Sequence, residues 1–286
     1  MKNMLSSPTT NETNLLKKSN SKGDMEKESQ PLSNESKKFS IIIPAYNEEN
    51  RIKPVLEDIV DYITQNNLDW DIILAIDGND GTEVYVRNIM NQYQFVSYTK
   101  GKGRSGKGGA IKRSLGPKLG DFVILMDADG AISFKDIIES IPLLEEYDVV
   151  NFDRYKGREN KIPFIRRFVS RGYNILLRIL LGIKINDTQC GYKIIQTDIA
   201  KKIFEKTTIT NGFFYSSLFF YLQQLNTPII EVPIKYNHIT GSKFNVSSMV
   251  MGGLVSAIAF RIRMSPLSKF IPKVMCDLYY KKFRWI

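Results

Sequence analysis

The sequence of 286 residues has one histidine and two cysteines, and these scarce residues narrow what the protein can be. Cys190 and Cys276 stand far apart, so there is no CxxC pair and no disulfide-stapled scaffold. We expect no zinc enzyme, because His238 is the only imidazole available. The low cysteine content is typical of a reducing compartment. No charged start followed by an apolar run opens the sequence, so we also expect no secretory signal.

Acidic side chains are nearly lacking from the last part of the sequence. Residues 240–286 hold eight basic side chains and one acidic one, whereas residues 39–239 hold 25 basic and 24 acidic ones. Most of the net charge of +10 therefore lies in the last 47 residues. Such an excess indicates nucleic acid, acidic lipid or a phosphorylated substrate as a partner, and the plainer alternative is a solvated surface that aids solubility.

Residues 1–38 lack aromatic side chains and hold few apolar ones, so we expect a disordered polar tail. From Phe39 onward, short apolar runs alternate with helical patterns. We expect strands over residues 39–44, 71–76, 95–99, 121–126 and 148–152, and helices over residues 50–63, 82–90, 107–115 and 134–144. This alternation predicts an α/β fold whose mostly parallel sheet is covered by helices on both faces.

Helical patterns predominate after Asp153. We expect helices over residues 165–181, 197–204 and 217–225, and a short strand over residues 229–233. Residues 249–260 carry no charge, but they are fewer than the roughly 17 to 25 residues that span a bilayer. This stretch therefore predicts a buried or interfacial helix.

Four polar motifs follow the expected strands, at the edge where parallel sheets bind ligands. They are PAYNEE (44–49), DGNDGT (77–82), GKGRSGKGG (101–109) and DADG (127–130). In an extended chain, Asp127 and Asp129 point to the same side and can hold one hard cation. Such a cation can neutralise a departing diphosphate. A simple turn is the alternative, but the apolar run FVILM leads directly into the motif and favours a cation site.

The glycine-rich motif also matches patterns of other families. Gly101, Gly103 and Gly106 fit the GxGxxG of dinucleotide folds, with Asp127 about where a ribose-binding acid would lie. The motif also begins a Walker A pattern, but Gly108 stands where a metal-binding Ser or Thr is needed. A dinucleotide site would leave PAYNEE, DGNDGT and the second aspartate of DADG without a role. Both alternatives are therefore disfavoured.

Taken together, PAYNEE, Asp77, GKGGAIK, DADG and DTQCGYK (187–193) resemble the family 2 glycosyltransferases, which have the GT-A fold. The resemblance runs from about Phe39 to Arg263 and is greatest to the dolichyl-phosphate glucosyltransferase and mannosyltransferase branch. It implies a GT-A type open, mostly parallel sheet sandwiched by helices, with C-terminal amphipathic helices. It also implies an inverting transfer of a hexose from a nucleoside diphosphate sugar to dolichyl or polyprenyl phosphate, with Mg²⁺ or Mn²⁺.

The same resemblance implies roles for particular residues. The nucleotide sugar would be bound by Pro44, Tyr46, Glu48, Asp77, Lys107 and Asp127. The metal would be held by Asp127 and Asp129, with Asp129 in direct contact, and Lys243 of a GSK segment would join this pair in catalysis. The acceptor phosphate would be bound by Arg154, Arg167, Ser170 and Arg171.

The arginines support a phosphate ligand without reference to any family. Arg154, Arg167 and Arg171 fall within 18 positions, and guanidinium groups suit phosphate oxygens. On a helix, Arg167 and Arg171 would share one face. An ordinary amphipathic helix with a solvated basic face is the alternative.

One departure from the branch bears on the nucleophile. The segment FYSSL (214–218) stands where the branch often has FDVEL, so Ser216 and Ser217 provide no carboxylate. A sugar hydroxyl needs a general base, whereas a lipid phosphate is largely ionised at neutral pH. The departure therefore favours a phosphate nucleophile.

DTQCGYK resembles the glucosyl type more than the mannosyl type, which usually reads DPTSGFR, so UDP-glucose is the favoured donor. GDP-mannose as donor and a sugar hydroxyl as acceptor are the alternatives within the class. From another class, the basic C-terminal residues leave a nucleic-acid-binding module open, but no basic and aromatic single-strand platform accompanies the sheet, so we expect no nucleic acid partner.

Basic residues near the C-terminus stand among apolar and aromatic ones, a composition that suits an anionic membrane surface. We therefore expect a peripheral or interfacial enzyme on the cytoplasmic face of a membrane, without a confident transmembrane span. The expected organisation is a polar tail over residues 1–38, a GT-A catalytic domain over residues 39–243 and a basic amphipathic membrane-associating segment over residues 244–286.

Overall fold

A computed structural model of the chain describes residues 37–157, 164–237 and 246–265. The polar tail expected over residues 1–38 lies almost wholly outside the described residues. Lys243 and the basic residues after position 265 lie outside them as well.

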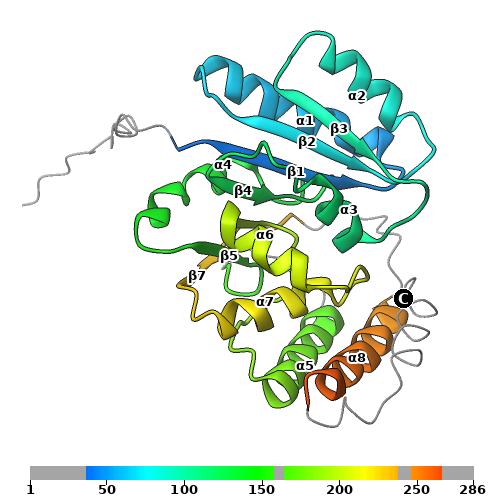
Figure 1. Cartoon of the computed structure of the whole chain (residues 1–286), viewed down its shortest axis with the longest axis vertical. Helices are drawn as coiled ribbons and strands as arrows, with labels where there is room; N and C mark the ends of the chain where they lie inside the picture. The colour runs from blue at the N-terminus through cyan, green and yellow to red at the C-terminus, as the bar shows by residue number, and fades with distance from the viewer. Residues whose placement is uncertain (1–36, 158–163, 238–245, 266–286) are drawn as a thin grey trace, which may run out of the picture. The chain divides into compact units, whose positions relative to one another are not determined.

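Within the residues that the structure describes, seven strands form one mixed sheet in the order β3-β2-β1-β4-β6-β5-β7 (Figure 1). They are β1 (Phe39–Ala45), β2 (Asp71–Ile76), β3 (Val96–Lys100), β4 (Phe122–Leu125), β5 (Val149–Asp153), β6 (Lys193–Gln196) and β7 (Ile229–Pro233). All neighbouring strands are parallel except β6, which runs antiparallel to both β4 and β5. The mostly parallel α/β sheet predicted from the sequence is thus confirmed.

Helices cover both faces of the sheet, because successive side chains of a strand point to opposite faces. Ile41 and Ile43 belong to one apolar core and Ile42 to the other. The first core is covered by α1 (Glu49–Gln65), α2 (Thr82–Met90), α4 (Phe134–Ile138) and the 3₁₀ helix η1 (Ile141–Glu145). The second is covered by α3 (Lys107–Ser114), α5 (Phe164–Leu181), α6 (Thr197–Lys206), α7 (Phe214–Gln224) and α8 (Val246–Arg263).

Two elements differ from the sequence-based expectation. The single helix expected over residues 134–144 is divided into α4 and η1, because Pro142 lacks an N–H and its ring clashes with the carbonyl four residues earlier. Strand β6 was not expected, since it begins at Lys193, the last residue of the DTQCGYK motif, and ends directly before a helix. This strand matters for the site, because it lies between β4 and β5.

Candidate active site

The turns that follow β1 and β2 are joined by reciprocal hydrogen bonds. The carboxylate of Asp80 accepts from the N–H of Glu49, the first residue of α1, at 3.0 Å. The carboxylate of Glu49 accepts from the N–H of Gly81, directly before α2, at 3.1 Å. Asn47 has a φ of 56°, a left-handed conformation that asparagine tolerates, and its side chain accepts from the N–H of Asn79 at 3.0 Å. Asp80, before α2, therefore binds the start of α1, and Glu49 of α1 binds the N–H directly before α2.

Three residues predicted to bind the nucleotide lie at the end of β1 or on the turn that follows it. The Tyr46 side chain is 40% exposed, and the guanidinium of Arg104 lies 4.7 Å from its ring centre. Pro44 is half-buried near the end of β1. The carboxylate of Glu48 pairs with Arg51 at 2.6 Å. The turn thus leaves the ring of Tyr46 partly exposed, while the acid of Glu48 is engaged by Arg51 of α1.

Asp77, at the end of β2, is almost buried and is bound by the glycine-rich segment 101–106. It accepts hydrogen bonds from the N–H and the hydroxyl of Ser105 at 2.6 Å and 2.5 Å, and it pairs with Arg113 at 2.7 Å. A Cβ atom on Gly101 would come within 2.4 Å of the Asp77 carboxylate, so this close approach requires glycine. Asp77 therefore anchors the glycine-rich segment over the end of β2.

Asp127 and Asp129 follow β4 and are both half-buried. Lys107, the first residue of α3, pairs with the carboxylate of Asp127. Asp129 Oδ1 accepts from the N–H of Ala131 at 3.1 Å and from the hydroxyl of Tyr192 at 3.2 Å. Burial disfavours the charged form of Lys107, but the Asp127 carboxylate outweighs burial and raises the pKa of Lys107. The structure thus brings together the predicted acidic pair and a permanent cation.

The chemistry of this acidic pair fits a hard divalent cation. Carboxylate oxygens are the ligands that Mg²⁺ prefers, and it commonly takes one or two of them beside substrate phosphates and water. Within the described ranges, no group of three or more His, Cys, Asp or Glu side chains could hold a metal ion. A cation held by Asp127 and Asp129 would therefore need further oxygen ligands, such as substrate phosphates and water.

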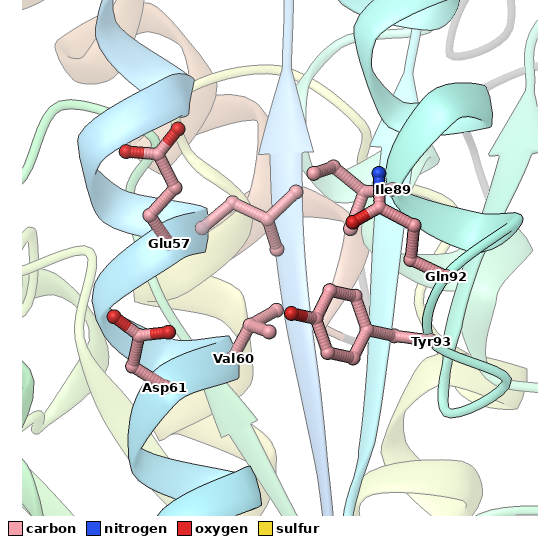
Figure 2. A pocket seen from close by; sticks show the side chains of 7 residues that line it. Glu57, Val60, Asp61, Ile89, Gln92 and Tyr93 are labelled. Carbon is pink, nitrogen blue, oxygen red and sulfur yellow. The ribbon is translucent and has the colours of Figure 1, made fainter.

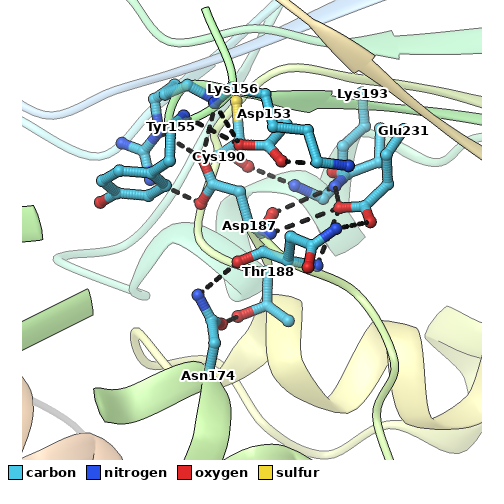
Figure 3. A network of polar contacts seen from close by, with 12 residues as sticks. Asp153, Tyr155, Lys156, Asn174, Asp187, Thr188, Cys190, Lys193 and Glu231 are labelled. Atoms are coloured by element: carbon cyan, nitrogen blue, oxygen red, sulfur yellow. Dashed lines mark hydrogen bonds and ion pairs between the residues drawn. The ribbon is translucent and has the colours of Figure 1, made fainter. Parts of the chain in front are cut away.

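Arg154, predicted to bind the acceptor phosphate, forms a two-pronged ion pair with Asp187 at 2.8 Å and 2.9 Å. Burial disfavours the charge on Asp187, but the Arg154 guanidinium outweighs it and lowers the pKa of the carboxyl. Figure 3 shows Asp187 within a polar network that includes Glu231, whose carboxylate accepts from the N–H of Asp187 at 3.3 Å. The pair therefore stabilises the DTQCGYK segment.

The other predicted acceptor residues lie on α5. Arg167 and Ser170 are half-buried and Arg171 is exposed. The hydroxyl of Thr188 donates to Asn174 of α5 at 2.9 Å, so the helix is joined to the segment that pairs with Arg154 (Figure 3).

Two further residues near the acidic pair were missed in the sequence analysis. The ring of Tyr215 lies 5.0 Å from the ammonium of Lys107 and 4.2 Å from that of Lys193. Lys193 is fully buried and donates to the carbonyl of Cys190. Burial lowers the pKa of Lys193 to about 8. A lysine directly before two isoleucines, at positions 194 and 195, is the one sequence signal that could have pointed to it.

Residues 40–204 match the sequence pattern of the glycosyl transferase family 2. The chain belongs to this family. It is 30% identical over 242 residues to a dolichyl-phosphate beta-glucosyltransferase of Dictyostelium discoideum, a match that covers 78% of this chain and 74% of that protein. The resemblance seen in the sequence motifs is therefore confirmed, and the protein is a glycosyltransferase.

Solved structures confirm the GT-A type fold of this family 2 glycosyltransferase. Glucosyl-3-phosphoglycerate synthase of M. tuberculosis superposes with a TM-score of 0.60 at 20% identity, covering 79% of this chain and 80% of that one. Another structure of that synthase, which holds Mn²⁺ and UDP-glucose, superposes with a TM-score of 0.56 at 19% identity, covering 77% and 79%.

In this glycosyltransferase the exposed face of α5 is mostly apolar, although Arg171 and Arg178 are exposed as well. The exposed side chains are Phe164, Ile165, Phe168, Ile175 and Ile179, which recur at helical spacing. Helix α8 packs beside α5 and adds Ile258 and Ile262, which are 43% and 37% exposed (Figure 1). Among the helices that the structure describes, none combines the length and the apolar character needed to cross a bilayer.

A cavity of about 220 Å³ lies between α1 and α2 of the glycosyltransferase (Figure 2). It is lined by Leu56, Glu57, Val60, Asp61, Ile89, Gln92 and Tyr93. Both helices begin at the carboxyl edge of the sheet and run back from it, and Tyr93 stands just before β3 begins. The cavity therefore lies away from the acidic pair and is not part of the active site.

Proposed function

We propose that this glycosyltransferase moves glucose from UDP-glucose to dolichyl or another polyprenyl phosphate, with inversion at the anomeric carbon. One observation carries the choice of acceptor. Helix α5 bears Arg167, Ser170 and Arg171 beside an exposed apolar face, so one helix offers ligands for both a phosphate and a lipid chain. The names of the relatives, dolichyl-phosphate beta-glucosyltransferases, support the same choice.

On the donor side, Asp127 and Asp129 would hold Mg²⁺ or Mn²⁺ against the diphosphate. When bound, this cation neutralises charge on the departing diphosphate. Lys107 supplies a second positive charge beside Asp127. Tyr46 offers its exposed ring to the nucleotide base, and we assign Lys243 to the same diphosphate. The Mn²⁺ and UDP-glucose in the structural neighbour support this choice of donor and metal.

On the acceptor side, the lipid phosphate would attack the anomeric carbon without losing a proton. A new bond forms between a phosphate oxygen and that carbon while the bond to the diphosphate breaks, and the electron pair leaves with the diphosphate. The hydroxyl of Ser216 lies within 2.9 Å of the Gln189 amide and 3.1 Å of the Tyr173 hydroxyl. The hydroxyl of Ser217 donates to the carbonyl of Phe214 at 2.7 Å. Neither serine supplies a base, which agrees with an ionised nucleophile.

The apolar face of α5 suggests where the enzyme works. We propose that α5 and the segment 244–286 lie on the cytoplasmic face of a membrane, with the catalytic domain over residues 39–243 above it. Arg171 is exposed on α5, and Arg261 is exposed on α8 near its apolar residues. Basic residues beside apolar ones gain roughly 1 kcal/mol each at an anionic surface. The enzyme would thus reach its lipid without crossing the bilayer.

The decisive test supplies labelled nucleotide sugars together with dolichyl phosphate and Mn²⁺. We expect label from UDP-glucose to enter the organic phase and to be released by mild acid, and we expect Asp129→Asn to abolish this transfer. Label from GDP-mannose in place of UDP-glucose would overturn the choice of sugar. Label that stays in water, on an added sugar acceptor, would overturn the lipid phosphate.

A further inference from the structure

The segment that leads into β6 lies against the acidic pair because of how the sheet is ordered. Strand β6 runs antiparallel to β4, and Lys193 stands opposite Leu125. Continued two residues beyond the end of β4, this register puts Gly191 opposite Asp127. Residues far apart in sequence therefore meet where the metal-binding carboxylates lie.

Because Gly191 has no side chain, the Asp127 carboxylate can occupy the space beside its backbone. A Cβ atom at position 191 would come within 2.4 Å of every atom of that carboxyl group. The carbonyl of Gly191 accepts from the hydroxyl of Tyr215 at 3.2 Å, so the backbone here is held from the other side as well. The wall behind Asp127 is thus made of backbone rather than of a side chain.

Tyr192 provides the corresponding contact to Asp129. Its side chain is 1% exposed, and its hydroxyl lies 3.2 Å from Asp129 Oδ1 and 3.4 Å from the carbonyl of Asp127. The N–H of Ala131 donates to the same Oδ1 at 3.1 Å. Two donors on one oxygen restrict rotation of the carboxylate. None of the roles assigned above uses this tyrosine hydroxyl.

We propose that Tyr192 is a positioning residue that holds the Asp129 carboxylate in the orientation that receives the divalent cation. This inference rests on the proposed function, in which Asp129 is a metal ligand. Groups that orient metal ligands from outside the coordination shell typically change metal affinity about 10- to 100-fold when they are removed. Tyr192→Phe keeps the buried ring and removes only the hydroxyl.

The test measures Mn²⁺ binding directly, through the electron paramagnetic resonance signal of free Mn²⁺ in the presence of UDP. We expect Tyr192→Phe to raise the Kd for Mn²⁺ about tenfold. The matched control is Tyr173→Phe. It also removes a tyrosine hydroxyl, here from a half-buried side chain 3.1 Å from Ser216 Oγ, and it should leave the Kd for Mn²⁺ unchanged. In the transfer assay, Tyr192→Phe should raise the Mn²⁺ concentration for half-maximal rate and keep kcat at saturating Mn²⁺ within about twofold.

Circular dichroism checks that each variant is folded, and Tyr192→Met serves as a second variant without the hydroxyl. If wild type binds Mn²⁺ with UDP, and folded Tyr192→Phe or Tyr192→Met binds it equally well, the positioning role is wrong while the metal site stands. If wild type and Asp129→Asn bind Mn²⁺ equally, the metal assignment itself is wrong and the role of Tyr192 falls with it. A lower kcat with an unchanged metal requirement would also overturn the inference.

Discussion

The ammonium of Lys107 pairs with the carboxylate of Asp127, 20 residues further along the chain. The pair joins the first residue of α3 to the end of β4. It also keeps a positive charge beside the acid that we assign to the metal and the diphosphate. The start of α3, which resembles a phosphate-binding glycine loop in sequence, thus contributes a side-chain cation to the site.

Replacing Lys107 with methionine should lower kcat/KM for glucose transfer about 100- to 1000-fold, the range seen when one preorganised charge-stabilising group is lost. Lys107→Arg retains the charge and should recover part of the rate. Steady-state assays with UDP-glucose varied at saturating Mn²⁺ give both values. A Lys107→Met enzyme within twofold of wild type would remove this lysine from the mechanism.

Gly191→Ala should inactivate the enzyme, because its Cβ would meet the Asp127 carboxylate at 2.0 Å. We expect at least a tenfold loss of Mn²⁺ affinity together with a lower unfolding temperature, since the backbone of the wall must shift. Gly116→Ala is the control, because nothing lies within 4 Å of a Cβ atom there. Equal activity of the two variants would mean that Asp127 and Asp129 still function when the backbone at position 191 is displaced.

Asp187→Asn should lower the free energy of unfolding by about 3 to 5 kcal/mol, because it removes the carboxylate charge that pairs with the buried guanidinium of Arg154. The pKa of Asp187 is lowered in the folded protein, so its contribution to stability is present above the ordinary value near 4 and is lost as the pH falls through the lowered value. Urea unfolding from pH 6 to pH 3 should therefore show a weaker acid dependence in Asp187→Asn. The same slope in both proteins would contradict this reading.

Lys193 should make the wild type more stable as the pH rises from 8 to 9. Its folded pKa of about 8 lies below the ordinary 10.5, so in this range the unfolded chain binds the proton that the folded protein has released. We expect a gain of about 1 kcal/mol relative to Lys193→Met, which cannot titrate. Urea unfolding of both proteins at pH 8 and pH 9 measures this difference, and the same change in both proteins would contradict it.

Phe168→Glu combined with Ile179→Glu should weaken binding to anionic vesicles at least tenfold. Each apolar side chain that becomes buried in the membrane contributes about 1.5 to 3 kcal/mol to binding. Both residues are exposed on α5, at 69% and 76%. Val84→Glu is the matched control, because Val84 is 64% exposed on α2, which covers the other face of the sheet. Vesicle flotation assays compare the variants with wild type. Equal flotation of all proteins would mean that α5 does not bind the membrane surface.

The first half of the fold could be predicted because its strands are short apolar runs separated by helices of regular period, as β1 and α1 show. The acidic pair could be predicted because both aspartates directly follow such a strand. Neither the partner of Arg154 nor that of Asp129 could be predicted. Both partners depend on β6 lying between β4 and β5, an order that no local pattern encodes.

The antiparallel strand β6 also sets the moment at which the site can form during synthesis. Tyr192 follows Asp129 by 63 residues, so the acidic pair leaves the ribosome well before Gly191 and Tyr192, which lie against it. Strands β1, β2, β3 and β4 can already pair with one another by then, while the free edge of β4 stays open to any other strand. The arrival of β6 closes that edge and brings Gly191 and Tyr192 against the proposed metal site in the same step.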